Sequence, residues 1–276
     1  MGVSFEKNGT LLIDSDEDPS AIRQFLRSYE PWRHKIDFTG GISTTDFRQK
    51  KLLNNNPLSK IMRVEELIGG FGAFRRALDV GSNAGYNSIY LAEKHGMHVV
   101  GIDYWDRHVA VSKRLAQLAG TRNCSFKQVD SESYIDDADF DLIIHFGTLY
   151  HLKNPILALQ TALANLRSGG TLLIETQVYG APEETRSAYI QNLHGDISNW
   201  WALGQAALVD ILKMLGTDVE IIGDRYKLPV PDQYRIFVKA VKTDASKIKH
   251  RSRIQRCMQL LLGSDKSGLK FGPDDD

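Results

Sequence analysis

The chain has 276 residues, of which 42% are hydrophobic and 25% are charged, a composition that is typical of a soluble globular protein with one large domain. Its formal net charge is zero, so no global field indicates a nucleic-acid partner. The two cysteines, Cys124 and Cys257, lie far apart without a CxxC pair or a Cys/His cluster, so we expect no metal site, and a reducing, cytoplasmic location.

The first 70 residues mix short apolar runs with turn-forming residues, which predicts an irregular, partly helical lid over 1–70. Within it we expect a strand at 9–14 and helices at 21–30 and 60–71. The N-terminus lacks a basic start followed by a long apolar core, so we expect no signal peptide. No apolar run in the chain approaches about 18 residues, so we expect no membrane span.

Residues 71–241 alternate between strand and helix patterns, which predicts the main domain. Strands are expected at 76–81, 98–104, 124–130, 140–147, 171–178, 218–226 and 234–242. Helices are expected at 87–96, 108–120, 156–170 and 205–216, with glycines at their ends. Apolar runs on the strands fit a sheet covered on both faces. We therefore predict an α/β fold with a doubly wound, mostly parallel, seven-stranded Rossmann-like sheet and an antiparallel C-terminal hairpin.

The last segment, 242–276, is a basic tail. Its part 242–256 holds six Lys or Arg against one Asp. Such a run is usually the solvated face of a helix, and the alternative is a strip that contacts phosphates of RNA or of lipid headgroups.

A glycine-rich turn follows the first strand of the main domain and reads Gly-Ser-Asn-Ala-Gly, with Gly81, Asn83 and Gly85 at its ends and centre. Such a turn between strand and helix brings backbone N–H groups close to a ligand. The next strand ends in Asp103, where a carboxylate can accept hydrogen bonds from both hydroxyls of a ribose. The pattern predicts a nucleoside site.

The third strand ends in Asp130, followed by Ser131 and Glu132, a position suited to the edge of an adenine. We assign Tyr104, next to the ribose carboxylate, and Gly147, after the fourth strand, to the same cofactor site. The glycine spacing departs from GxGxxG, which disfavours a dinucleotide. The ordered set resembles class I S-adenosylmethionine (SAM) methyltransferases. That resemblance implies SAM as the cofactor and Asp79 as a partner of its ammonium group.

Four sequence motifs point to a more specific family within this class: PWR (31–33), GTLYHLKNP (147–155), GGTLLIETQV (169–178) and NWWALGQAALVDILKMLG (199–216). Over roughly 31–240 the chain resembles the tRNA wobble-uridine carboxymethyltransferase family and its bacterial relatives. The resemblance implies that Tyr150 faces the sulfonium end of the cofactor and that Arg235 reaches the same pocket. In the carboxymethyl enzymes these positions bind an extra carboxylate together with a lysine directly after PWR.

The chain departs from that family in its C-terminal portion, which ends differently, and at two places in the N-terminal part. His34 follows PWR, with Lys35 one place on, and the stretch 41–52 contains no tryptophan. We therefore expect plain SAM as donor and transfer of a methyl group.

Two residues at strand ends are candidates for catalysis beside Tyr150. His151 is either a general base for a substrate hydroxyl or amine, or a histidine that orients a loop. Glu175 either binds a substrate cation or hydroxyl, or pairs with a nearby arginine. His145, inside LIIHF, is expected to be a hydrogen-bonded core histidine.

Three aromatic residues, Tyr179, Trp200 and Trp201, are predicted to line the substrate pocket, with core packing as the alternative. From the lid, Tyr29 and Arg33 could also reach this site.

The predicted function is transfer of a methyl group from SAM to an oxygen or nitrogen of a small molecule. The alternatives are modification of the wobble uridine of tRNA and a non-catalytic binding module with this fold. Nicotinamide-dependent reduction is disfavoured by the glycine pattern. The acceptor and the oligomeric state are not indicated by the sequence.

Overall fold

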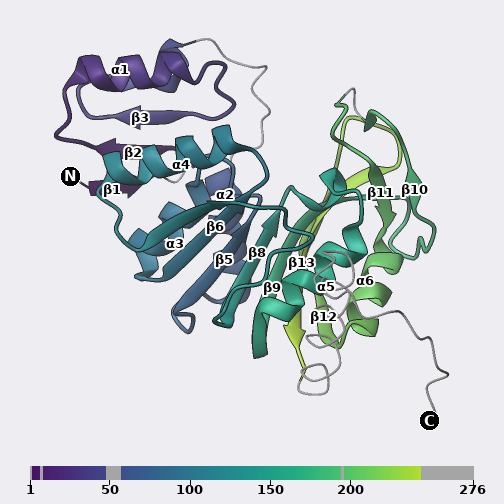
Figure 1. Ribbon diagram of the computed structural model, residues 1–276. Helices are drawn as coiled ribbons and strands as arrows, with labels where there is room; N and C mark the ends of the chain where they lie inside the picture. Colours follow the sequence, from purple (N-terminus) through teal and green to yellow (C-terminus); the bar gives the residue numbers. More distant parts are fainter. Residues whose placement is uncertain (1, 7–8, 48–56, 194–195, 244–276) are drawn as a thin grey trace, which may run out of the picture.

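The computed structural model describes residues 2–6, 9–47, 57–193 and 196–243. Among them, nine strands form one large sheet and four form a smaller N-terminal sheet (Figure 1). No helix in these residues is long and apolar enough to cross a membrane. The predicted basic tail lies outside the described residues, apart from its first two positions.

Five parallel strands make the centre of the large sheet, in the order β7-β6-β5-β8-β9. They are β5 (Arg76–Val80), β6 (His98–Asp103), β7 (Cys124–Gln128), β8 (Phe140–Phe146) and β9 (Leu166–Tyr179). The hairpin of β12 (Thr217–Lys227) and β13 (Gln233–Lys242) adds to β9 in antiparallel direction. The strand order reverses between β5 and β8, which leaves a crevice at their carboxyl ends. The predicted fold class is confirmed.

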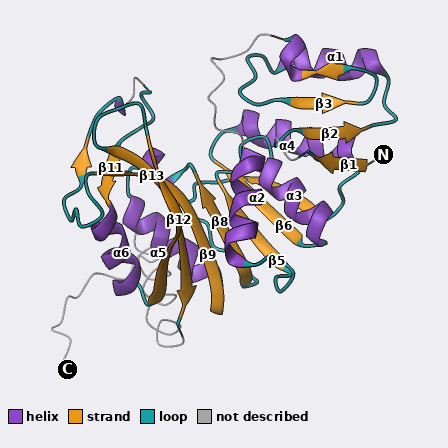
Figure 2. Ribbon diagram, turned by 180° about the vertical axis from the view of Figure 1, so that it is seen from behind, coloured by secondary structure: helices purple, strands orange, loops and turns teal. Residues whose placement is uncertain are grey.

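Helices cover both faces of this sheet (Figures 1 and 2). One face carries α2 (Pro57–Ile68), α3 (Tyr86–His95) and α4 (Asp106–Ala119). The other carries α5 (Pro155–Asn165) and α6 (Gln205–Met214). Neighbouring strand residues alternate between the two cores: Ile144 belongs to the cluster on the first face and Ile143 to the cluster on the second. Both are fully buried, as expected for a sheet with helices on both sides.

Two short strands that we did not predict enlarge the sheet beyond seven. They are β10 (Ala188–Tyr189) and β11 (Trp201–Gly204). The pairing of β8 with β9 ends at Glu175, whereas β9 continues to Tyr179. The freed edge pairs in parallel with β11 at Val178–Tyr179, so β11 lies beside the carboxyl end of β9. Strands of two and four residues carry too few alternating positions to be recognised in a sequence.

The predicted helix 156–170 was too long at its C-terminal end. Helix α5 ends at Asn165, whose side-chain amide donates to the carbonyl oxygens of Tyr134 and Thr161 at 2.7 and 2.9 Å. The ammonium of Lys242 donates to the carbonyls of Leu163 and Leu166, both at 2.6 Å. These side chains satisfy the last helical carbonyls, so the glycines at 169–170 lie in β9 instead of ending the helix.

The lid is more regular than predicted. Strands β1 (Gly2–Phe5), β2 (Leu11–Asp14), β3 (Ile36–Phe38) and β4 (Ile42–Ser43) form a four-stranded sheet. Helix α1 (Pro19–Ser28) is capped by Asp18, which accepts from the backbone N–H of Ser20 at 2.8 Å, and the short η1 (Thr44–Asp46) follows β4. The strand expected at 9–14 corresponds to β2. The other three have two to four residues, which is shorter than the mean, so their patterns do not stand out in the sequence.

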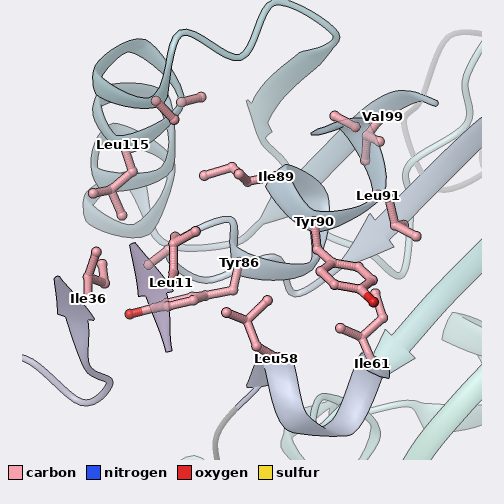
Figure 3. Packing of buried hydrophobic residues seen from close by; sticks show 14 of the residues in the cluster. Leu11, Ile36, Leu58, Ile61, Tyr86, Ile89, Tyr90, Leu91, Val99 and Leu115 are labelled. Atoms are coloured by element: carbon pink, nitrogen blue, oxygen red, sulfur yellow. The ribbon is translucent and has the colours of Figure 1, made fainter. Parts of the chain in front are cut away.

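The lid shares its hydrophobic core with the main domain. Leu11 and Ile36 of the lid sheet pack in the same cluster as Leu58 of α2 and Tyr86 of α3 (Figure 3). Tyr86 follows the glycine-rich turn directly, and its ring lies edge-on to His34 of the lid, with centroids 5.3 Å apart. The turn is therefore in contact with the lid through its next residue.

Candidate active site

The glycine-rich turn is held by hydrogen bonds to the neighbouring strand β6. The N–H groups of Gly81 and Ser82 both donate to the carbonyl of Ile102 at 2.9 Å. The N–H of Asn83 donates to Oδ2 of Asp103 at 2.9 Å. Gly81, Asn83 and Gly85 all have positive φ, at 71°, 50° and 80°. The turn is thus a tight, preformed structure that meets Asp103 at the carboxyl edge of the sheet.

The glycines are required by packing as well as by φ. A Cβ on Gly81 would lie 2.3 Å from Oγ1 of Thr148, and one on Gly85 would lie 2.9 Å from the ring of Phe126. The hydroxyl of Thr148 donates to the carbonyl of Val80 at 3.1 Å. The turn after β5 is therefore in close contact with the segment that follows β8.

Asp79 lies beneath the turn, 1% exposed. Its Oδ2 accepts from the hydroxyl of Ser88 at 2.7 Å. Burial raises the pKa of Asp79 to about 6, and the nearby charge of Asp103 adds to the rise, although Ser88 opposes it. The role of Asp79 toward an ammonium group stays a prediction.

Asp103 is 7% exposed and has three protein partners. Besides Asn83, its Oδ1 accepts from the N–H of Trp105 and contacts Nδ1 of His108, both at 3.0 Å. Because each carboxylate oxygen has two acceptor positions, Oδ2 retains one of them. His108 was not predicted; it lies in the first turn of α4, five residues after Asp103. Tyr104 and Trp105 beside it are 65% and 59% exposed.

The residues at the end of β7 form a turn of their own. Oδ1 of Asp130 accepts from the N–H of Glu132 at 2.9 Å, and Asp130 is exposed. Ser131 lies between them, half-buried. Oε1 of Glu132 accepts from the N–H of Asn154 at 3.0 Å, which links this turn to the start of α5. The predicted contact of these residues with an adenine is compatible with this position and stays a prediction.

A cavity of about 160 Å³ lies between the lid and the glycine-rich turn. It is lined by Tyr29, Pro31, Trp32, Arg33, His34, Asn83, Ala84, Tyr86, Arg107, His108 and Val111. The guanidinium of Arg107 donates to the backbone carbonyls of Tyr29 and Glu30, the latter at 2.7 Å, and so joins α4 to the lid. The structure thereby brings the predicted lid residues Tyr29 and Arg33 to the cavity beside the turn.

At the ends of β8 and β9, four side chains form a largely buried polar cluster, which we call the β9 cluster: Lys60, Tyr150, Glu175 and Arg235. Glu175, 1% exposed, accepts from Nζ of Lys60 at 2.9 Å and from Nη1 of Arg235 at 2.8 Å. Nη2 of Arg235 donates to the hydroxyl oxygen of Tyr150 at 3.0 Å. The predicted pair of Tyr150 and Arg235 is therefore in direct contact.

The charges of the β9 cluster do not cancel. Burial raises the pKa of Glu175, but Lys60 and Arg235 reverse the shift, so the pKa lies below its ordinary value. Burial lowers the pKa of Lys60 despite the attraction of Glu175. Burial raises the pKa of Tyr150, which stays neutral. With Lys60 protonated, two cations face one anion, and an anionic group beside them would be stabilised and would in turn favour the protonated lysine.

Lys60 was missed in the sequence. It lies on α2, 115 residues from Glu175, and no local pattern marks it. Position 34, which directly follows PWR, carries a half-buried histidine whose pKa is lowered to about 4 by desolvation, with Lys60 and Arg33 adding to the effect. One of the two cations of the β9 cluster is thus supplied from α2.

Gly147, at the end of β8, faces the β9 cluster. A Cβ at this position would lie 3.4 Å from the hydroxyl oxygen of Tyr150 and 3.7 Å from Oε2 of Glu175. Its N–H donates to the carbonyl of Glu175 at 2.8 Å. Gly147 therefore borders both the crevice and the cluster.

His151 lies next to Tyr150 in the short helix η2 (Leu149–His151), and the two rings are 4.4 Å apart. Its Nδ1 contacts the carbonyl oxygen and the hydroxyl of Ser198, both at 3.1 Å. His145 is fully buried in β8 as predicted, but the expectation that it is hydrogen-bonded was wrong. Neither of its ring nitrogens has a partner among the described residues.

The predicted aromatic wall is partly assembled by the segment 180–204. Trp200 stacks on Tyr189 with centroids 6.0 Å apart and planes at 22°, and Trp201 lies edge-on to the same ring at 5.7 Å. The N–H of Trp200 donates to the carbonyl of Tyr150 at 2.9 Å. Tyr189, which the sequence analysis missed, is 57% exposed. Tyr179 is placed at the end of β9, opposite Gln233.

Comparisons with known proteins agree with the fold. Residues 75–221 match the family described as Methyltransferase domain. The tRNA U34 carboxymethyltransferase of Desulfotalea psychrophila (strain LSv54 / DSM 12343) is 30% identical over 172 residues, which cover 62% of this chain and 50% of that protein. The enzyme of the same name from Idiomarina loihiensis (strain ATCC BAA-735 / DSM 15497 / L2-TR) is 26% identical over 227 residues, which cover 80% of this chain and 67% of that protein. The chain spans about half the length of the first curated relatives it matches.

Among solved structures, the N-terminal domain of EvdMO1 in the presence of SAH and D-fucose is similar, with a TM-score of 0.68 and 18% identity. The match covers 82% of this chain and 97% of that domain. The YcgJ protein of Bacillus subtilis is similar with a TM-score of 0.54 and 17% identity, over 67% of this chain and 97% of that one. At these identities the likeness concerns the fold.

Proposed function

The chain belongs to the methyltransferase domain family that its residues 75–221 match, and from this premise we propose that it alkylates a uridine of tRNA. The predicted class, a class I SAM-dependent methyltransferase, is confirmed by the family and by the fold. The proposed acceptor is supported by the curated relatives, which are tRNA U34 carboxymethyltransferases. It replaces the small molecule as our first candidate.

The residues of the β5–β6 edge fit an adenosine cofactor. Oδ2 of Asp103 retains a free acceptor position for a ribose hydroxyl, and Oδ1 is shared with His108, which can turn aside. The exposed rings of Tyr104 and Trp105 offer apolar surface beside it. Arg33 at the lid cavity carries a charge that suits a carboxylate. When bound there, SAM would supply an electrophilic methyl group on a sulfonium.

The main observation in support of the proposal at the ends of β8 and β9 is the charge of the β9 cluster. An excess positive charge beside a sulfonium is repulsive unless an anionic group lies between them. Such a group is a carboxylate on the donor or an ionising oxygen on the acceptor. The hydroxyl oxygen of Tyr150 accepts from Arg235, so its own hydrogen is directed to a further acceptor. Because Lys60 replaces the missing lysine after PWR, carboxymethyl transfer regains support beside methyl transfer.

A small-molecule acceptor is the second candidate, since a specific observation favours it. Tyr189 and Trp200 form a stacked pair whose backbone is joined to Tyr150, and such a surface suits a sugar ring. The similar domain of EvdMO1 was crystallised in the presence of D-fucose.

Two measurements test these proposals. Calorimetry should show SAM binding that Asp103→Ala abolishes; unchanged affinity in that variant would remove the assignment of the ribose site. Release of S-adenosylhomocysteine is then followed with SAM or its carboxylated form as donor, and with tRNA or a panel of sugars as acceptor. Turnover with tRNA, with the added mass on a uridine, supports the first candidate. Turnover with sugars alone supports the second, and no turnover with any acceptor favours a binding module.

A further inference from the structure

A chain of hydrogen bonds runs from His151 into the segment 196–198. Nδ1 of His151 lies 3.1 Å from both the carbonyl oxygen and the hydroxyl of Ser198. The hydroxyl of Ser198 donates to Oδ1 of Asp196 at 2.6 Å, and the N–H of Ser198 donates to the same oxygen at 3.0 Å. Asp196 therefore fixes both the backbone and the side chain of Ser198.

These bonds determine the tautomer of the imidazole. A carbonyl oxygen can only accept, so the hydrogen between it and Nδ1 must be carried by Nδ1. The single hydrogen of the Ser198 hydroxyl is used by Asp196, so this oxygen also presents a lone pair to Nδ1. In the neutral ring, Nε2 is then left with its lone pair, and it has no partner among the described residues.

We infer that Asp196 and Ser198 are positioning residues, which hold His151 with its hydrogen on Nδ1 so that Nε2 accepts the proton of the acceptor group. The inference rests on the proposed function, because it deepens the same site. As the acceptor oxygen forms its bond to the transferred carbon, the carbon–sulfur bond breaks and its electron pair stays on sulfur. The acceptor's proton moves to Nε2 and is later lost to water. Asp196 takes no proton and stabilises the imidazolium through Ser198.

The charges around the ring are consistent with a base. Burial lowers the pKa of His151, which keeps the imidazole neutral at neutral pH, while the Ser198 carbonyl and Asp196 oppose this shift. Arg235 and Arg33 add to the lowering. The buried hydroxyl of Tyr150 is the other titratable group beside the ring. A neutral imidazole with a free Nε2 is the form that general-base catalysis requires.

The first test needs no acceptor. Long-range proton–nitrogen NMR spectra of the protein labelled with ¹⁵N-histidine report the tautomer, and His151→Gln identifies the signal of His151. We expect the Nδ1–H tautomer in the unaltered protein, and a mixture of tautomers in Asp196→Ala. The Nε2–H tautomer in the unaltered protein would overturn the inference and leave the proposed function untouched.

The second test is the pH profile of turnover with whichever acceptor is active. Asp196→Ala and Ser198→Ala should each lower kcat about tenfold to a hundredfold, because the base is misplaced. In Asp196→Ala the acidic limb should also move to lower pH, since the imidazolium has lost a nearby anion. Affinity for SAM should stay unchanged.

The matched control for both variants is Ile197→Ala. Ile197 lies in the same turn and is 77% exposed, so its truncation should alter neither kcat nor the pH profile. A loss of kcat in Asp196→Ala without movement of the limb would overturn the inference and indicate a structural role. If Asp196→Ala fails to fold, the tautomer of His151 is measured in Ser198→Ala instead, and an unchanged Nδ1–H tautomer there would contradict the inference. Absence of turnover with every acceptor would contradict the proposed function, while the tautomer still tests the positioning.

Discussion

In the half of the crevice formed by β5 and β6, the ligand-facing structure is a backbone turn closed onto Asp103. In the half formed by β8 and β9, it is a set of charged side chains from three distant segments, joined at Glu175. The first half depends on conformations that only a few residue types can adopt. The second depends on desolvated charges that stabilise one another. Substitutions should therefore act through different physical effects in the two halves.

The largest effect is expected from Glu175→Gln. Two largely buried cations, Lys60 and Arg235, would lose their shared carboxylate, and removal of one partner from a buried ion pair costs up to roughly 3–5 kcal/mol of unfolding free energy. Urea denaturation measures it. The matched control is Glu220→Gln, whose partner Lys239 lies 3.6 Å away on the exposed side of the hairpin, where less than about 1 kcal/mol is expected. Equal effects at both positions would show that the β9 cluster contributes no more than a surface pair.

Each half also contains a buried titratable group, and their pH dependences have opposite signs. Asp79 has a pKa raised to about 6, so its stabilising contribution is complete below its ordinary value of 3.8 and is lost as pH rises through 6. His145 has a pKa lowered to about 4 by burial, so its contribution is complete above 6.5 and is lost as pH falls through 4.

Urea denaturation between pH 4 and 7.5 should separate the two groups. Asp79→Asn is expected to raise the unfolding free energy at pH 7.5 by up to about 3 kcal/mol. The unaltered protein should lose a similar amount of unfolding free energy on acidification to about pH 4, and His145→Leu is expected to abolish that decrease. Unfolding free energies that vary with pH as in the unaltered protein would exclude these groups as the cause.

The half formed by β5 and β6, which we call the cofactor half, was predictable to a large extent, because its residues lie in short, recognisable sequence patterns. Gly81 and Asp103 lie at the ends of consecutive strand patterns, Gly85 closes the turn after the first of them, and parallel strands bring their carboxyl ends to one edge. In the half formed by β8 and β9, which we call the acceptor half, Tyr150 and Arg235 were predicted only because of the resemblance to a known family. Lys60 and Ser198 have no local pattern, since their partners lie 115 and 47 residues away. Of the lid strands only β2 was predicted; the other lid strands, β10 and β11 were missed because they carry too few alternating positions.

A smaller effect on the unfolding free energy is expected from Gly81→Ala. This substitution tests whether glycine is required in the turn only because of its positive φ or also because of the contact with the acceptor half. Gly81 and Gly96 have φ of 71° and 65°, so alanine at either position costs about 1–2 kcal/mol. Only at Gly81 would the new Cβ also meet Thr148, at 2.3 Å, whereas nothing lies within 4 Å at Gly96. We expect Gly81→Ala to exceed Gly96→Ala by roughly 1–2 kcal/mol in urea denaturation. Equal losses would mean that Thr148 moves aside freely.

The smallest effect concerns the lid, which contacts the cofactor half through Arg107. Its guanidinium donates to the backbone carbonyls of Tyr29 and Glu30, and Arg107 is exposed, so these bonds compete with water. Arg107→Met should lower the affinity for SAM about fivefold, which corresponds to roughly 1 kcal/mol, while kcat stays unchanged. Arg122→Met is the control, because Arg122 is exposed just beyond the same helix and has no ion pair among the described residues. A fall in kcat with unchanged affinity would instead place the lid's influence on the acceptor half, and the division between the two halves would then not hold.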